Sequence, residues 1–283
     1  VAEPTGLRAM NPTIPAPAAR PQALSRMPAG DVDGLLTDID DTLTRDGRLA
    51  ASTFLALERL HRAGIRIVPV TGRSAGCAHM ILKTWPVDAV VAESGGLYLA
   101  RDPANGRLRE VMHDDPAAVA RDRAGVLAIA EEILASNVGF APASDHPYRR
   151  VDVAIDWCEE IDPVPPAALA AAIARFHRAG YQARASSVHV NAWSGSFDKA
   201  PMALRCLREV WSIDEDQARA RWVFIGDAPN DASMYEALPR SVGVANIGPM
   251  LDRLPVPPAY LTPASHGAGF EQLAEHLLRG RGG

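Results

Sequence analysis

Residues 35–44 read Leu-Leu-Thr-Asp-Ile-Asp-Asp-Thr-Leu-Thr, an apolar run followed by three carboxylates within four positions. A short apolar run of this kind predicts a buried β-strand. In an open α/β sheet, ligands bind beyond the carboxyl ends of the strands, which is where Asp38 and Asp40 would lie. Clustered carboxylates raise one another's pKa and need a proton or a cation to coexist. Because no soft ligand is nearby, a hard ion such as Mg²⁺ suits this cluster.

A second apolar run ends in acids nearer the C-terminus. Residues 222–231 read Trp-Val-Phe-Ile-Gly-Asp-Ala-Pro-Asn-Asp, and Gly226 permits a tight turn directly before Asp227. Strand-end acids on one parallel sheet can complete one metal site, so Asp38, Asp40 and Asp227 are expected to converge on one divalent cation. Taken alone, Asp40 and Asp41 could be ordinary turn or helix-capping acids. Two unrelated turns are a weaker explanation of both clusters together.

Two weaker signals suit the oxygens of a phosphoryl group. Thr71 and Gly72 directly follow the apolar run Ile65–Val70, where a hydroxyl and backbone N–H groups could hold phosphate oxygens. A plain helix cap by Thr71 explains the same residues equally well. Lys199 stands immediately before a predicted helix, and its compact positive charge could neutralise phosphoryl oxygens. From its position alone, an ordinary surface lysine is by far the favoured interpretation.

Strands and helices alternate along both ends of the chain, which predicts an α/β fold with a doubly wound, Rossmann-like parallel sheet. The expected strands are Val32–Thr37, Ile65–Val70, Ala89–Ala92, Trp222–Ile225 and Val242–Val244. The expected helices are Ala51–Ala63, a stretch up to about Lys83, Pro201–Trp211, Ala232–Ala237 and one near Phe270–Leu278.

The middle of the chain predicts an inserted α+β cap domain at residues 113–194, which divides the catalytic core into residues 31–112 and 195–283. Its expected elements are a helix near Pro116–Asn137, a strand at Val151–Asp156, a helix at Pro165–Gly180 and a strand at Ser187–Trp193. Residues 1–30 are rich in Pro and Ala and lack a helical or strand period, so they are expected to form a disordered tail.

Composition narrows the classes of function. The formal net charge of −5 argues against non-specific binding to nucleic acid or to an anionic membrane. Cys77, Cys158 and Cys206 lie far apart without a CxxC pair, which favours a reducing compartment over a disulfide framework. No apolar run reaches membrane-spanning length and no secretory signal is visible, so a cytoplasmic location is expected.

In order along the chain, DIDDT (38–42), the strand ending in Thr71, Lys199 and GDAPND (226–231) resemble the four motifs of the haloacid dehalogenase superfamily. The insertion between the second and third motifs resembles a class II cap. Its α+β content and the ending at residues 260–269 are similar to the Cof-type (class IIB) branch, which includes sucrose-phosphate, trehalose-phosphate and mannosyl-phosphoglycerate phosphatases. The chain departs at Glu93-Ser94-Gly95-Gly96, where the branch often has Asn-Gly, and at Asp41, which replaces a common glycine.

The resemblance implies a Mg²⁺-dependent phosphatase of a small phosphorylated metabolite, with a sugar phosphate as the expected substrate. It implies that Asp38 is a nucleophile that becomes transiently phosphorylated and that Asp40 is the general acid and base. The implied Mg²⁺ ligands are Asp38, the backbone carbonyl of Asp40, and Asp227. The implied phosphate-binding residues are Thr71, Gly72, Arg73 and Lys199. The implied supporting residues are Asp231, Asn230 and Thr42, and Asp231 is expected to orient Lys199 or a metal-bound water.

Alternation on the predicted cap strand places His189, Asn191 and Trp193 on one face. A sugar ring could stack on Trp193 and accept or donate a hydrogen bond at Asn191. The plainer alternative is that this face is the exposed side of the cap sheet. Arg149 and Arg150, near the cap strands, are further candidates for substrate contact.

Three other functions remain open at this point. A phosphomutase shares the nucleophile and the metal but passes the phosphoryl group to a different acceptor. A phospho-acceptor switch of the receiver type also combines a strand-end Asp with Thr and Lys, but it is smaller and has no inserted cap. A degenerate sugar-phosphate-binding protein is disfavoured because every reacting group is present. Partners other than a small molecule are not expected, and the protein could be a monomer or a homodimer.

Overall fold

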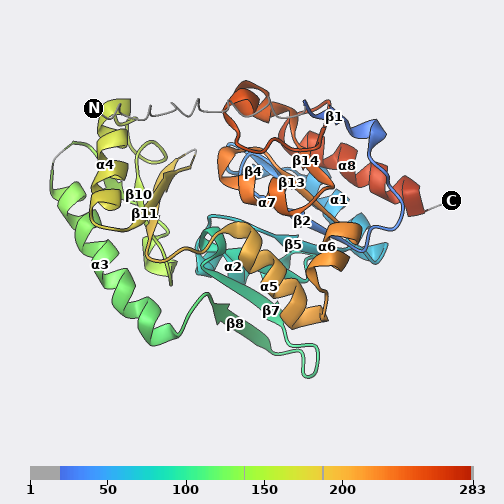
Figure 1. The fold of residues 1–283 in the computed structure, drawn as a ribbon, viewed down its shortest axis with the longest axis horizontal. Helices are drawn as coiled ribbons and strands as arrows, with labels where there is room; N and C mark the ends of the chain where they lie inside the picture. The colour runs from blue at the N-terminus through green and yellow to red at the C-terminus, as the bar shows by residue number, and fades with distance from the viewer. Residues whose placement is uncertain (1–19, 137, 187, 282–283) are drawn as a thin grey trace, which may run out of the picture.

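A six-stranded parallel sheet forms the centre of the computed structural model, which describes residues 20–136, 138–186 and 188–281 (Figure 1). Its strands stand in the order β1 (Gln22–Ala23), β15 (Tyr260–Leu261), β14 (Ser241–Gly243), β13 (Trp222–Gly226), β2 (Gly34–Thr37) and β5 (Arg66–Pro69). Every neighbouring pair in this order is parallel.

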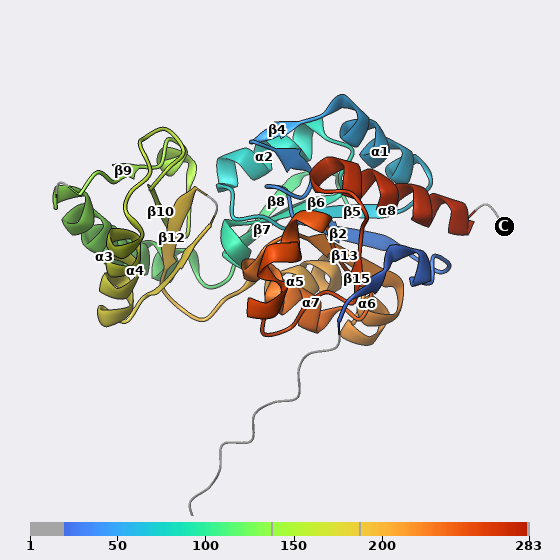
Figure 2. The ribbon, with the colours of Figure 1, turned by 90° about the horizontal axis from the view of Figure 1, so that it is seen from above.

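The sheet is buried on both faces because neighbouring residues of each central strand point into opposite cores. Leu35 belongs to one apolar cluster and Leu36 to the other, and Ile225 and Phe224 are divided in the same way. Helices α1 (Ala51–Arg62), α2 (Ala75–Thr84) and α8 (His266–Arg281) supply the first cluster, and α5 (Lys199–Trp211), α6 (Glu215–Arg221) and α7 (Ala232–Ala237) supply the second. Figure 2 shows α1 and α8 on one side of the sheet and α5, α6 and α7 on the other. The predicted doubly wound α/β fold is confirmed.

The third expected core strand, β6 (Ala89–Ala92), is attached differently from the prediction. It adjoins β5 of the parallel sheet, where Val70 and Val91 form an isolated parallel bridge. Its other edge pairs antiparallel with β7 (Leu97–Arg101), which pairs in turn with β8 (Leu108–Met112). The tight turn at Glu93–Gly95 reverses the chain before a crossover helix can form, so β7 returns beside β6.

The register between β2 and β13 brings the two acid clusters together. Thr37 pairs with Ile225, so both strands end at the same level of the sheet edge. Gly34 makes this pairing possible at the other end, because a Cβ atom there would lie 2.4 Å from the ring of Trp222. Asp38 and Asp227 therefore leave the sheet side by side.

An inserted unit lies beside the sheet edge that carries these acids, with its two helices on the outside (Figures 1 and 2). It consists of α3 (Pro116–Ala135), β9 (Ala141–Pro142), β10 (Val153–Asp156), α4 (Pro166–Arg178), β11 (Gln182–Ala185) and β12 (His189–Trp193). Its four strands form an antiparallel sheet in the order β11-β12-β10-β9. Val190 and Ala192 pack against the two helices in a separate apolar cluster, which leaves the other face of β12 towards the core.

The expected tail requires a correction from residue 20 onward. Residues 1–19 lie outside the described residues, but β1 pairs with β15, and Leu24 and Met27 are buried in the main core. The burial of these two apolar side chains holds the segment against the core, although its sequence has no helical or strand periodicity. Asn137 and Ser187, at the ends of two expected elements, also lie outside the described residues.

A short hairpin and several tight turns complete the described chain. The hairpin joins β3 (Thr44–Arg45) to β4 (Arg48–Leu49) through Asp46 and Gly47, both at positive φ. The 3₁₀ segments are Leu24–Arg26, Glu93–Gly95, His146–Tyr148, Pro229–Asp231 and Ala245–Arg253. Within the described ranges, no helix has both the length and the apolar character that crossing a bilayer requires.

Candidate active site

Three buried carboxylates meet where β2 and β13 end. One carboxylate oxygen from each of Asp38, Asp227 and Asp231 lies within 4.8 Å of the others. The backbone N–H of Asp38 donates to the carbonyl of Ile225 at 2.9 Å, which fixes the first acid against the strand that delivers the second. The structure brings Asp38 and Asp227 together, but the third acid of the group is Asp231 and not the predicted Asp40.

Lys199 is the cation of this group and is not a surface residue. Its Nζ donates to Oδ1 of Asp38 and to Oδ1 of Asp231, each at 2.7 Å, and the residue is only 1% exposed. It is the first residue of α5, where Asp198 caps the helix by accepting from the Lys199 N–H at 2.7 Å. The capped helix therefore directs the ammonium group between two acids.

The loop after β13 holds its acids through a close backbone turn. Oδ2 of Asp231 accepts from the N–H groups of Asp227 and Ala228 at 3.1 and 3.3 Å. A Cβ atom on Gly226 would lie 2.3 Å from that same oxygen, so the turn requires glycine. Asp231 thus contacts both the Lys199 ammonium group and the Asp227 backbone, and its supporting role in catalysis stays a prediction.

Asp227 is oriented from its other side by two polar residues. The hydroxyl of Thr42 donates to one Asp227 oxygen at 3.3 Å, and the amide of Asn246 donates to the other at 3.2 Å. Asn246 also donates to the carbonyl of Asp41 at 3.0 Å. Asn246 was not among the predicted residues. It lies just beyond the end of the expected strand Val242–Val244, as Asp38 and Asp227 lie just beyond the ends of their strands.

The three acids carry more negative charge than Lys199 balances. Burial raises the pKa of Asp38 to about 7, with repulsion from Asp231 and Asp40 adding to the rise against the opposing effect of Lys199. Burial and repulsion from Asp38 and Asp231 raise the pKa of Asp227 to about 9. Burial alone would lower the pKa of Lys199, but Asp231 and Asp38 outweigh it and raise that pKa. This crowded set of oxygen donors fits a hard divalent cation.

The carboxylate of Asp40 lies apart from the three-acid group and pairs with Arg73. The Nε atom of Arg73 lies 3.0 Å from Oδ2 of Asp40, and Nη2 lies 2.5 Å from Oδ1. Burial would lower the pKa of Arg73, but its bonds to Asp40 raise it. The Asp40 carboxylate is therefore not part of the group formed by Asp38, Asp227 and Asp231. The predicted metal ligand from this residue is its backbone carbonyl.

Thr71 is not a helix cap. Helix α2 begins at Ala75 and is capped by Ser74, whose side chain accepts from the N–H of Cys77. The buried hydroxyl of Thr71 instead accepts from the Arg73 N–H at 3.1 Å. Gly72 and Arg73 line the cavity described below. A phosphate-binding role for Thr71, Gly72 and Arg73 stays a prediction.

A cavity of about 620 Å³ lies between the acids and the inserted sheet. Asp38, Asp40, Asp227 and Asn230 line its core side, and the inserted unit lines the other side. A volume of this size accommodates a small metabolite.

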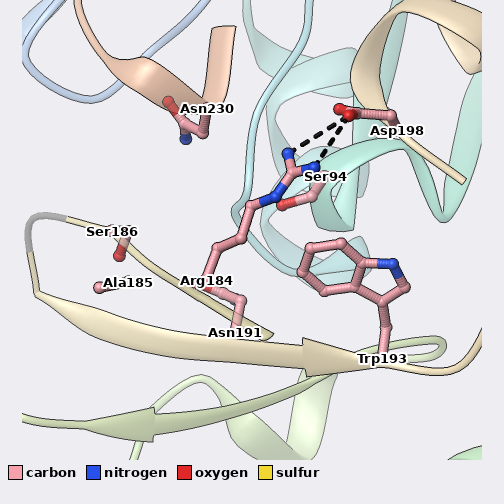
Figure 3. A pocket seen from close by; sticks show the side chains of 8 residues that line it. All are labelled: Ser94, Arg184, Ala185, Ser186, Asn191, Trp193, Asp198 and Asn230. Atoms are coloured by element: carbon pink, nitrogen blue, oxygen red, sulfur yellow. Dashed lines mark hydrogen bonds and ion pairs between the residues drawn. The ribbon is translucent and has the colours of Figure 1, made fainter. Parts of the chain in front are cut away.

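The predicted face of β12 is neither exposed nor free for stacking. Asn191 lines the cavity and donates to Oδ2 of Asp152 at 3.0 Å. Trp193 is only 2% exposed, and its ring packs against Phe197 at 5.5 Å between centroids and against the Arg184 guanidinium at 5.6 Å. Figure 3 shows Arg184 reaching from beside Trp193 to Asp198, with which it forms an ion pair at 3.2 Å. The prediction that a sugar stacks on Trp193 is wrong for this arrangement, because these groups already cover the ring.

The two predicted arginines have different surroundings. Arg149 is buried, pairs with Asp145 and Asp152, and donates to the carbonyl of Gly72 at 3.1 Å, so it ties the insertion to the core. The Arg150 side chain is mostly exposed and lies 3.6 Å from Glu110.

Glu93, for which the sequence predicted no role, forms a second connection between the insertion and the core. Its carboxylate accepts from the N–H groups of Ala75, Arg150, Val151 and Asp152 at 2.6–2.9 Å. Burial and the neighbouring Asp152 raise the pKa of Glu93 to about 7, against the effect of these donors.

Comparison with known proteins agrees with this geometry. Residues 35–119 match the family model of haloacid dehalogenase-like hydrolases. No curated protein matches the chain in sequence. Among solved structures, the chain is similar to the Thermoplasma acidophilum protein 0175, with 18% identity over 87% of this chain and 98% of the other and a TM-score of 0.67.

Two further solved structures come from proteins described as phosphatases. The sucrose-phosphatase of Synechocystis sp. PCC6803, solved with sucrose and phosphate, has 19% identity over 88% of this chain and 98% of its own, with a TM-score of 0.61. BT1666 of Bacteroides thetaiotaomicron, described among phosphatases of the superfamily, has 20% identity over 89% and 97%, with a TM-score of 0.58. At these identities the structural likeness shows the fold, and the family model adds the sequence match. The sequence match to haloacid dehalogenase-like hydrolases covers residues 35–119, and the structural likeness over most of the chain shows that the chain has the same fold as these solved structures.

Proposed function

We propose that the protein is a Mg²⁺-dependent phosphatase that hydrolyses the phosphoric monoester of a small metabolite, with a sugar phosphate as the expected substrate. The observation that carries the proposal is the group of Asp38, Asp227, Asp231 and Lys199 at the end of adjacent parallel strands, beside a cavity of about 620 Å³. The fold shared with a sucrose-phosphatase supports it.

Asp38 is the proposed nucleophile. Lys199 holds one of its oxygens, which leaves the second to attack phosphorus. The new Asp38–phosphorus bond forms as the bond from phosphorus to the ester oxygen breaks, and the leaving alkoxide takes a proton from Asp40. Two displacements of this kind replace one difficult hydrolysis.

Asp40 also serves the second step. Having lost its proton, it accepts one from the water that attacks the phosphorylated Asp38, so inorganic phosphate leaves and both acids return to their starting forms. Proton donation needs the neutral carboxyl group, so the ion pair with Arg73 has to loosen when substrate enters. Arg73 is then free to approach the phosphoryl oxygens.

Asp38, Asp227 and the Asp40 backbone carbonyl would hold Mg²⁺, with Asp231 close enough to orient its surroundings. The ion would supply charge that offsets the repulsion between the nucleophilic carboxylate and the phosphate. Lys199 offsets part of the same repulsion, and Thr71 and the Gly72 amide are the proposed partners of the remaining oxygens.

Residues 113–194 are proposed to act as a cap that sets substrate specificity over a catalytic core of residues 31–112 and 195–283. Arg149, bonded to the Gly72 carbonyl, and Arg184, paired with Asp198, both cross between the inserted unit and the core. Contacts of this kind would hold the cap closed over the site and keep bulk water out.

A phosphate-release screen over phosphomonoesters with Mg²⁺ tests this function. The proposal predicts inorganic phosphate from at least one sugar phosphate and faster release from p-nitrophenyl phosphate than in a protein-free control. Conversion of a sugar phosphate to an isomer without phosphate release would identify a phosphomutase instead. No release from any ester of the panel would reject the phosphatase.

A further inference from the structure

The cap side of the cavity carries its charge in two groups. In the first, the Arg149 guanidinium lies between two carboxylates: Nε and Nη2 donate to Asp145 at 2.9 and 3.0 Å, and Nη1 donates to the two Asp152 oxygens at 2.7 and 2.9 Å. Both carboxylates are held by one guanidinium, so this group has a net negative charge. Arg149 also draws the pKa of Asp145 below its ordinary value although burial works the other way.

Arg149 is not available to a ligand anion. To reach one, it would have to leave Asp152, which is fully buried and would then be an unpaired charge. Breaking a buried pair in this way is strongly unfavourable. Asp145, by contrast, keeps part of its surface towards the cavity.

In the second group, the Glu159 carboxylate lies beside the His189 imidazole. Their side-chain atoms Oε2 and Nε2 lie 2.6 Å apart, and both residues line the cavity. The Glu159 side chain is 43% exposed and that of His189 is 12% exposed, so the carboxylate is the more accessible partner. Even with a charged imidazole, the pair has no net positive charge.

The remaining cations near the cavity are also paired. Arg73 pairs with Asp40 and, when that pair loosens, is the proposed partner of the reacting phosphoryl group, so it is not left for a second anion; Lys199 lies between Asp38 and Asp231. Arg184 pairs with Asp198, outside the main cavity. Among the described residues that line this cavity, each arginine therefore already has a carboxylate partner.

From these charges we infer that the site accepts phosphomonoesters whose leaving group is an uncharged or amine-bearing polyol and rejects those with a second anionic group, and that Glu159 is a specificity-determining residue. This inference rests on the proposed phosphatase function. A second phosphate or a carboxylate would lie near Asp145 and Glu159 without a cation, and like-charge contacts oppose binding. Hydroxyl groups can instead bond to these carboxylates and to Ser144, Ser186 and Asn191, which line the same cavity.

The test uses two esters that differ at one group. Sorbitol 6-phosphate and 6-phosphogluconate differ in a terminal hydroxymethyl group against a carboxylate. Each is measured as a competitive inhibitor of p-nitrophenyl phosphate hydrolysis, so neither has to be a good substrate. Sorbitol 6-phosphate is expected to have a Ki at least about tenfold lower, which corresponds to about 1.4 kcal/mol. The ratio should narrow as salt screens the repulsion.

Charge reversal at Glu159 identifies the residue responsible. Glu159→Lys should reduce the Ki ratio by about tenfold, and Glu159→Gln should fall between it and the unaltered protein. Glu160→Lys makes the same change in net charge at an exposed neighbour that does not line the cavity, and should leave the ratio unchanged.

The outcomes separate the two claims. Hydrolysis of p-nitrophenyl phosphate with equal Ki values, or with a ratio that Glu159→Lys does not alter, would overturn the inference and leave the phosphatase in place. Failure to hydrolyse p-nitrophenyl phosphate or any ester of the screen would instead reject the phosphatase on which the inference rests.

Discussion

An Asp38→Asn variant is expected to lose at least about 10⁴-fold of the phosphate-release rate while keeping its fold, because an amide cannot attack phosphorus and no other group replaces it. The substitution keeps the size of the side chain and an oxygen that can accept from Lys199. Since burial and neighbouring acids already raise the pKa of Asp38 to about 7, a neutral group at this position should not destabilise the protein.

The measurement combines phosphate release with thermal unfolding followed by circular dichroism. Asp216→Asn, an exposed position on α6, is the matched control and should behave like the unaltered protein in both assays. Appreciable turnover in the Asp38→Asn variant would show that another group receives the phosphoryl group.

An Asp40→Asn variant is expected to lose about 10²- to 10⁴-fold of its turnover, the usual range for general acid–base catalysis. The loss should depend on the leaving group, since p-nitrophenolate leaves without a proton whereas a sugar alkoxide does not. With p-nitrophenyl phosphate the first step should survive and the second should slow. A burst of nitrophenol equal to the enzyme concentration should therefore precede slow turnover.

Stopped-flow absorbance measures the burst, and steady-state phosphate release measures the loss on sugar phosphates. Asp46→Asn, on the exposed turn of the β3–β4 hairpin, controls for a nearby change of charge. Unchanged rates on sugar phosphates in the Asp40→Asn variant would remove Asp40 from both proton transfers.

The sequence was sufficient for the sheet and its acids because their signals are local. An apolar run that stops at an acid predicts both a buried strand and the residue at its end, and parallel pairing of β2 with β13 then places Asp38 beside Asp227. The sequence located Lys199 at the start of a helix and made it a candidate site residue. The fold shows that its ammonium group is buried between two acids.

The predictions that were wrong involve contacts between segments that are far apart in the sequence. β1 has two residues, and its pairing with β15, together with the burial of Leu24 and Met27, holds the end of a Pro- and Ala-rich segment against the core. Strand alternation correctly put Trp193 on the inner face of β12, but it could not show that Phe197 and Arg184 cover the ring. The Arg150 and Val151 N–H groups that donate to Glu93 are also more than fifty residues away from it in the sequence, so no local pattern predicts these hydrogen bonds.

The proposed reaction depends on a divalent cation shared by the strand-end acids, and a Mg²⁺ titration tests this shared site most directly. Calorimetry at several pH values should show one Mg²⁺ bound per chain with release of protons. Because the raised pKa values of about 7 for Asp38 and about 9 for Asp227 mean that protons compete with the metal, affinity should weaken as the pH falls below about 7 and strengthen above it.

Asp227→Asn should weaken this binding, and excess chelator should stop phosphate release until Mg²⁺ is restored. Full phosphate release in excess chelator, or Mg²⁺ binding that neither pH nor Asp227→Asn alters, would contradict a metal held by these acids.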